Sequence, residues 1–207
     1  MKTSTRVLCA GAVLALAGCG VLPEKETLAL YAPVPTVAPD ASWPQVDWQL
    51  QVSRPTADSV VDSGRIAVRP VPGELQVYKG ARWAQPVPEL VHRSLVRAFE
   101  DSGRLRGVSA RNGDGIAGAY QLVLDIRRFE ADYAGAATPS VEVAIMAKLV
   151  PTTDNQVVAS QLFAAQVPVG ATDVASVAMG FERALGQVNG QIVGWTLREG
   201  QRHARGR

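Results

Sequence analysis

Cysteine and histidine are scarce in this chain of 207 residues, which contains two of each. A disulfide scaffold needs several paired cysteines and a zinc site needs clustered cysteine or histidine ligands, so neither framework is expected. His92 falls in a predicted helix, where we expect a half-exposed surface residue. His203 falls in an arginine-rich tail that we expect to be disordered. We therefore predict no metal site and no bound cofactor.

Motifs that carry catalytic chemistry are also missing. The sequence has no Gly-x-Ser-x-Gly nucleophile elbow and no glycine-rich phosphate-binding loop. Residues 112–115 form a predicted turn that lacks the downstream acidic ligands of a calcium loop. The densest carboxylates, Asp125, Glu130 and Asp132, fall on or just after a predicted strand, and we interpret them as its solvated face. The sequence thus predicts a protein that is not an enzyme.

No run of apolar residues near the start is long enough to span a membrane. Residues 7–17 form an apolar run of about eleven residues, whereas a spanning helix needs ~20. Lys2 and Arg6 precede this run, and Leu16-Ala17-Gly18-Cys19 closes it. A short apolar run with a basic start and a small-residue end is typical of a signal peptide, and this ending is the pattern of bacterial lipoprotein processing.

We predict cleavage before Cys19, so that residues 1–18 are a lipoprotein signal peptide. Cys19 is then the lipidation site, carrying a diacylglyceryl thioether and an N-acyl chain, and residues 19–26 form a polar tether. An ordinary secretory signal and a buried apolar helix are the alternatives. Because Cys9 leaves with the signal and Cys19 is lipidated, the mature chain cannot form an internal disulfide.

The mature chain has no excess of either charge. Removing Lys2 and Arg6 from the 21 basic residues leaves 19, against 19 acidic residues. A neutral domain without basic runs gives no electrostatic case for binding nucleic acid. The one basic cluster is the tail, residues 198–207, which we expect to be disordered and at most weakly attracted to anionic headgroups or an acidic partner.

Hydrophobic periodicity predicts an α+β fold in residues 27–197, with an antiparallel sheet and two main helices packed on one of its faces. The proline-rich residues 32–44 are expected to form an extended loop. A helix is expected at residues 87–99, opened by prolines and Glu89 and stopped by Gly103 in a left-handed conformation. A second helix is expected at residues 174–195, capped by Thr172 or Asp173. The expected strands cover residues 27–31, 48–54, 65–69, 74–78, 105–110, 120–129, 141–149 and 157–167.

Two groups of residues are candidates for partner contacts. Gly186, Gly190 and Gly194 recur every four residues on the last helix, which indicates a close approach of the sheet or of a neighbouring subunit unless the small residues merely face solvent. Arg82 and Trp83 fall in a predicted loop, where such a pair suits a protein or interfacial surface. A tryptophan packed beneath the first helix is the alternative for Trp83.

The chain resembles the ABC-type transport auxiliary lipoproteins, which include the paraquat-inducible protein C family. The residues that carry the resemblance are Tyr31, Ser63-Gly-Arg-Ile-Ala-Val-Arg69, Tyr78, Arg82-Trp83-Ala84, the helix at 87–99, the alternating strand at 120–129 and the C-terminal helix. The resemblance covers roughly residues 27–195.

The resemblance implies a non-catalytic auxiliary subunit of a lipid-transport system, anchored in the inner leaflet of the outer membrane with its domain in the periplasm. The implied partners are an ABC permease and ATPase and a protein with mammalian-cell-entry domains, whose bridge the subunit docks. Gly20, in place of the aspartate that commonly retains lipoproteins at the inner membrane, agrees with this sorting. A homo-oligomer follows where the glycines at 186, 190 and 194 pack on a neighbouring subunit. A structural or assembly lipoprotein of the envelope is the alternative function.

Overall fold

The structure is a computed structural model that describes residues 27–110 and 118–206. Cys19, the signal peptide and the predicted turn at 112–115 lie outside the described residues. The elements are, in order, β1 (Ala29–Tyr31), β2 (Gln49–Val52), β3 (Thr56–Ala57), β4 (Arg65–Arg69), β5 (Gln76–Trp83), α1 (Val87–Ser102), β6 (Gly107–Ser109), β7 (Tyr120–Asp132), β8 (Ser140–Pro151), β9 (Ala159–Pro168) and α2 (Val174–Arg205).

All the strands belong to one mixed sheet. β7, β8 and β9 form an antiparallel meander, as their alternating pattern predicts. The short strands β2, β3 and β4 pair with the other edge of β7 in parallel. Parallel pairing there follows from the chain path, because α1 carries the chain across one face of the sheet between β5 and β7. The antiparallel expectation therefore holds for the meander and for β4–β5 only.

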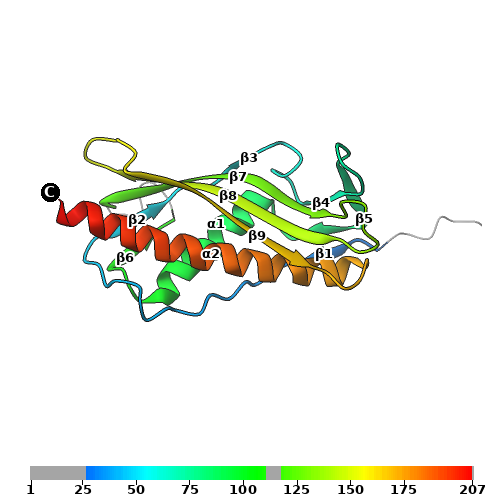
Figure 1. The fold of residues 1–207 in the computed structure, drawn as a ribbon, viewed down its shortest axis with the longest axis horizontal. Helices are drawn as coiled ribbons and strands as arrows, with labels where there is room; N and C mark the ends of the chain where they lie inside the picture. Colours follow the sequence, from blue (N-terminus) through cyan, green and yellow to red (C-terminus); the bar gives the residue numbers. More distant parts are fainter. Residues whose placement is uncertain (1–26, 111–117, 207) are drawn as a thin grey trace, which may run out of the picture.

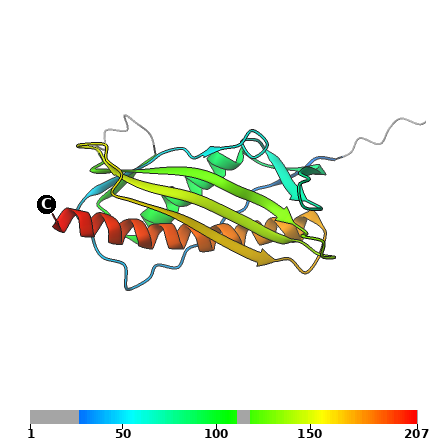
Figure 2. The ribbon, with the colours of Figure 1, turned by 45° about the horizontal axis from the view of Figure 1, so that its top comes forward.

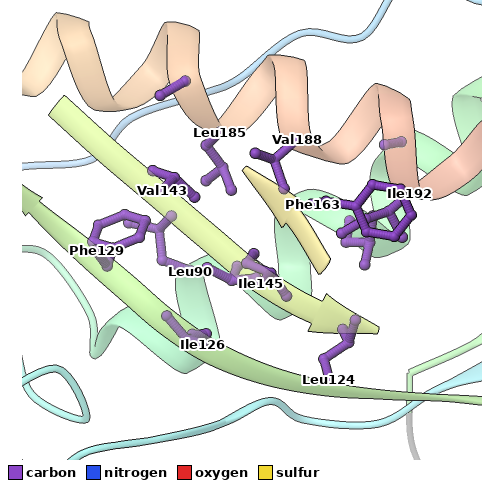
Figure 3. Close-up of a cluster of buried hydrophobic side chains, with 14 of the residues drawn as sticks. Leu90, Leu124, Ile126, Phe129, Val143, Ile145, Phe163, Leu185, Val188 and Ile192 are labelled. Carbon is purple, nitrogen blue, oxygen red and sulfur yellow. The ribbon is translucent and has the colours of Figure 1, made fainter. Parts of the chain in front are cut away.

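Both helices cover the same face of the sheet (Figures 1 and 2), which confirms the predicted α+β arrangement. Along β7, Leu122, Leu124 and Ile126 are buried, whereas Val123 on the opposite face is exposed. A bulge after Ile126 shifts the alternation by one residue, so Phe129 also points into the core. Figure 3 shows Leu124, Ile126 and Phe129 of β7 together with side chains of β8 and β9. They face Leu185, Val188 and Ile192 of α2, and Leu90 of α1 lies beside them.

α1 begins and ends where its sequence predicts. Pro86 precedes the helix, Glu89 lies in its first turn, and Gly103 ends it in the left-handed conformation with φ 61°. A left-handed φ favours glycine because it has no Cβ to clash with the backbone. Pairing with β1 and β4 makes β5 longer than expected, so residues 79–83 belong to a strand and the predicted loop at Arg82 and Trp83 is wrong.

α2 is much longer than its periodic core predicts. It runs for 32 residues, or about 48 Å, from the Asp173 cap to Arg205. The expectation of a disordered tail from residue 198 is therefore wrong. The final turns pack on the body of the domain, where the Tyr120 hydroxyl lies 2.9 Å from Nδ1 of His203 and 3.2 Å from the carbonyl oxygen of Gly200. No helix within the described ranges is both long and apolar enough to cross a membrane.

Candidate functional surfaces

Residues 32–48, here called the strap, lie along α2 in an extended conformation apart from a turn near Trp43. The backbone N–H of Val34 donates to Oε2 of Glu182 at 2.9 Å, which fixes the start of the strap. Trp43 and Trp48 are both buried near its end. The proline-rich loop predicted from the sequence is thus present, and it packs firmly on the helix.

The strap packs against Gly186, Gly190 and Gly194 of α2, here called the glycine stripe. A Cβ on Gly186 would lie 2.9 Å from the carbonyl oxygen of Thr36, and a Cβ on Gly194 would lie 2.5 Å from Nε1 of Trp43. Gly190 is less crowded, because its Cβ would lie 3.4 Å from Val37. The predicted close approach is present at Gly186 and Gly194, and the approaching segment belongs to the same chain and not to the sheet. A contact of the three glycines with a neighbouring subunit stays a prediction.

Gly200 extends the same stripe and was missed in the sequence, because it falls beyond the residues predicted to be helical. A Cβ at this position would run into the ring of Trp48. Its spacing of six residues from Gly194 becomes meaningful only once α2 is known to continue past Trp195. A predicted helix extended to residue 205 would have placed Gly200 on the same helix as the other three glycines.

Trp83 is a core residue and not an exposed contact. Its side chain is 2% exposed and packs edge-on against Phe129 and Phe181, with ring centroids 6.0 and 5.0 Å away. The strand alternation explains the difference between the neighbours: Arg82 points outward and is exposed, whereas Trp83 points inward. The prediction of an interfacial contact is therefore wrong for Trp83, and Arg82 stays a candidate.

The two histidines are engaged in packing. His92 is 7% exposed, and its Nε2 lies 2.9 Å from the carbonyl oxygen of Val52, so the half-exposed position expected for it is wrong. His203 lies in α2 and contacts Tyr120 through both a hydrogen bond and the ring face. No group of three potential metal ligands occurs in the part of the chain that the structure describes.

The carboxylates of β7 are bound to arginines. Asp125 pairs with Arg127 at 2.7 Å and, as predicted, stays on the partly solvated face. Glu130 is buried, in contrast to the expectation. Its burial is compensated because Arg69 donates hydrogen bonds to both carboxylate oxygens, at 3.1 and 3.0 Å. Arg128 joins Glu130 to Asp132 at 2.6 and 2.8 Å.

Arg128 also pairs with Glu142 of β8. The hydrogen bonds from Arg69 to Glu130, and the negative charge of Glu130, raise the pKa of Arg69 above its ordinary value. Burial acts to lower the pKa of Arg128, but its hydrogen bonds and the charges of Glu130 and Glu142 outweigh burial and raise it. These charge-assisted hydrogen bonds join β4, β7 and β8 across the sheet.

Three clefts lie along the helices. One cleft of about 450 Å³ lies along the line where the strap meets α2. Another of about 340 Å³ lies between the strap and α1, where Arg93 and Arg97 are exposed. The third, of about 410 Å³, lies at the far end of α2 and is called the arginine cleft. It is lined by Ser42, Pro44, Arg198, Gln201, Arg202 and Arg205. Three guanidinium groups around one concavity suit carboxylates or other anions.

The comparison with known families covers nearly the whole domain. A model of the ABC-type transport auxiliary lipoprotein component matches residues 27–193. The solved structure of protein XCC0632 from Xanthomonas campestris, a DUF330 protein, is 48% identical with a TM-score of 0.82, and the alignment covers 86% of this chain and 99% of that one.

A second solved structure, of an uncharacterised protein, is 14% identical with a TM-score of 0.62. The alignment covers 84% of this chain and 98% of that one, and it shows a shared fold only. No curated protein matches the chain.

Proposed function

This chain belongs to the ABC-type transport auxiliary lipoprotein family, and on that premise we propose that it is a non-catalytic subunit anchored in the inner leaflet of the outer membrane. In this role its periplasmic domain docks the bridge of a lipid-transport system. The bridge is built by a protein with mammalian-cell-entry domains, served by an ABC permease and ATPase. The single observation that carries the proposal is the family match, which spans the strap, the sheet and most of α2.

The strap supports the anchoring part of the proposal. The chain enters the domain at β1, close to the predicted lipidation site, and then lies against α2 through residues 34–48. Pull on the lipidated end would therefore reach a long helix through buried tryptophans and close backbone contacts, and not through a loose linker. A domain held in this way suits a subunit that must keep its place between a membrane and a partner.

The arginine cleft supports the docking part of the proposal. It lies about 36–47 Å along α2 from the helix start, at the end of the molecule opposite β1 (Figure 1). When the β1 end faces the outer membrane, the cleft faces the periplasm, from which the bridge approaches. We propose that an acidic surface of the bridge protein binds Arg198, Arg202 and Arg205.

Co-purification from membranes tests the proposed function. The lipidated chain is expected to recover the mammalian-cell-entry protein, the permease or the ATPase. Cys19→Ser is expected to release a folded, soluble domain and to abolish transport, because the anchor is lost. Recovery of outer-membrane assembly proteins and none of the transport components would instead support the structural or assembly role.

Charge reversal tests the docking surface. The variant Arg198→Glu/Arg202→Glu/Arg205→Glu is expected to lower recovery of the partner at least tenfold, whereas thermal unfolding shifts little because these side chains are exposed. The matched control is Arg93→Glu/Arg97→Glu, which reverses two exposed arginines on α1 and is expected to leave recovery unchanged. Equal losses in both variants would contradict docking at the arginine cleft.

A further inference from the structure

Three segments that are far apart in the sequence meet at one end of the molecule. They are β1 with the start of the strap, the turn at residues 70–75 between β4 and β5, and the first two turns of α2 (Figures 1 and 2). β1 pairs with residues 81–83 of β5, and β4 pairs with the end of β7 just before the turn at residues 70–75. We call this part of the molecule the anchor end.

The anchor end exposes an unusual share of large hydrophobic side chains. Ten such side chains are exposed among the described residues, and six of them belong to the three segments. Their exposed fractions range from 39% to 65%, and they are Leu28, Leu30, Val34, Val71, Leu75 and Met179. Single exposed hydrophobic residues are common on soluble proteins, but their concentration at one end indicates a surface that is covered in use.

Two exposed cations lie beside these side chains. Leu30 lies opposite Arg82 in the β1–β5 register, and Lys79 is exposed on the same strand. Within residues 27–110 and 118–206, neither cation has an ion-pair partner. Exposed aliphatic side chains flanked by lysine and arginine are the combination that binds the interface of an anionic bilayer.

The carboxylates at this end are already held by hydrogen bonds. Asp173 accepts a bond from the backbone N–H of Ser176, and Glu182 accepts one from the N–H of Val34. Glu74 accepts a bond from the side-chain amide of Gln76. The donors are neutral, so the three carboxylates keep their charge and the aliphatic side chains dominate this surface.

The short segment between Cys19 and the first described residue places this end near the membrane. Eight residues, 19–26, separate the predicted lipidated cysteine from the first described residue, and they reach at most about 30 Å when fully extended. The arginine cleft is about 36–47 Å farther along α2. The anchor end is therefore the part of the domain that the tether brings to the bilayer.

We propose that the anchor end binds the interface of the bilayer that holds the lipid anchor, with its aliphatic side chains among the headgroups and Lys79 and Arg82 against anionic lipid. This second contact fixes α2 away from the membrane plane and presents the arginine cleft to the periplasm. The proposal rests on the lipid anchor of the proposed function. It adds a contact made by the folded domain itself.

Site-specific fluorescence in vesicles tests the proposal. Lipidation blocks Cys19 and cleavage removes Cys9, so a single introduced cysteine can be labelled cleanly. Ala175→Cys reports on the anchor end, one helical turn before Met179, and Ala204→Cys is the matched control near the other end of α2. Both alanines are exposed and lie on the same helix, about 44 Å apart.

The lipidated full-length protein is reconstituted in vesicles of phosphatidylethanolamine and phosphatidylglycerol that contain nitroxide-labelled lipid. The label at position 175 is expected to be quenched at least threefold more than the label at position 204. Val71→Ser/Leu75→Ser/Met179→Ser is expected to remove most of this difference. Val157→Ser/Leu162→Ser, which changes exposed hydrophobic residues outside the anchor end, is expected to leave it intact.

Equal quenching at the two positions would overturn the proposal. Shielding of the label at position 175 from solvent that is equally strong without vesicles would also overturn the proposal. The surface would then be covered by another copy of the chain. A chain that fails this test but still recovers transport components refutes only the membrane contact. A chain that lacks lipid on Cys19 by mass spectrometry, or that recovers none of those components, refutes the proposed function instead.

Discussion

The two ends of α2 have similar interiors and different surfaces. At the anchor end, Trp83, Phe129 and Phe181 pack together beneath a surface rich in exposed aliphatic side chains. At the other end, Trp48 and Tyr120 pack together beneath a surface that carries three arginines around a cleft. The aromatic clusters hold both ends of the helix to the sheet, so the surfaces above them are free to differ. This contrast separates residues that maintain the fold from those that we propose to orient it.

The largest effect is expected from removing the aromatic cluster of the anchor end. Trp83→Ala should lower the free energy of unfolding by about 3–5 kcal/mol, because it leaves a cavity beside the stacked rings of Phe129 and Phe181. Urea unfolding measures this loss. Arg82→Ala is the control on the same strand, and its exposed side chain should change stability by no more than about 0.5 kcal/mol. Similar values for the two variants would contradict the separation of core from surface.

A smaller effect is expected along the strap, which joins the two ends. Gly186→Ala should destabilise the protein by about 1–3 kcal/mol, because the added methyl meets a backbone oxygen at 2.9 Å that cannot rotate away. Gly190→Ala is the matched control four residues later, where the methyl has space. It should be neutral or stabilise the helix by up to about 1 kcal/mol. Thermal unfolding measures the stability of both variants. A Gly186→Ala protein more stable than the parent would mean that the strap does not pack against Gly186.

The far end of α2 depends on a polar contact. Tyr120→Phe should cost about 0.5–1.5 kcal/mol, because the hydroxyl bonds to Gly200 and His203 are lost while the ring packing stays. Hydrogen exchange of residues 200–205 should accelerate, and that of the first turns of α2 should not. Uniform acceleration along the helix would indicate that the two ends are not stabilised separately.

The smallest effect is expected at the start of α2, where its magnitude depends on pH. Hydrogen bonds from the side chain and the backbone N–H of Ser176 hold the pKa of Asp173 below its ordinary value. A carboxyl with a lowered pKa in the folded state stabilises it above the unfolded-state pKa, about 3.9, and loses that effect as pH falls through the folded-state pKa. Asp173→Asn should therefore be less stable than the parent at pH 7 and nearly equal to it at pH 2. A constant difference across that range would refute the linkage.

Local pattern was sufficient for the elements whose surroundings repeat along the chain. Alternation predicted β7, β8 and β9, because each buries one face against the same helical layer. Spacing of three and four residues predicted the core of α2, and prolines, Glu89 and Gly103 predicted the bounds of α1. The same reading predicted a close approach at the glycine stripe, because three glycines in a helix are costly without a packing reason.

Other features depend on contacts between segments that are distant in the sequence. Nothing near Trp83 indicates that a strand eight residues long pairs on both sides and turns this side chain inward. Burial of Glu130 requires Arg69, which is 61 residues away. The last turns of α2 read as a solvated arginine-rich tail until Tyr120 and Trp48 are placed against them.

The sequence by itself determined the class of the fold, the faces of its long strands and helices, the predicted address at Cys19 and the absence of a recognisable catalytic motif. These depend on periodicity and on short motifs, which are complete within one segment. Only the tertiary structure decided what covers the glycine stripe, which of Arg82 and Trp83 faces solvent, and where the exposed hydrophobic side chains gather. Such properties belong to surfaces made by several segments at once, so no single segment contains them.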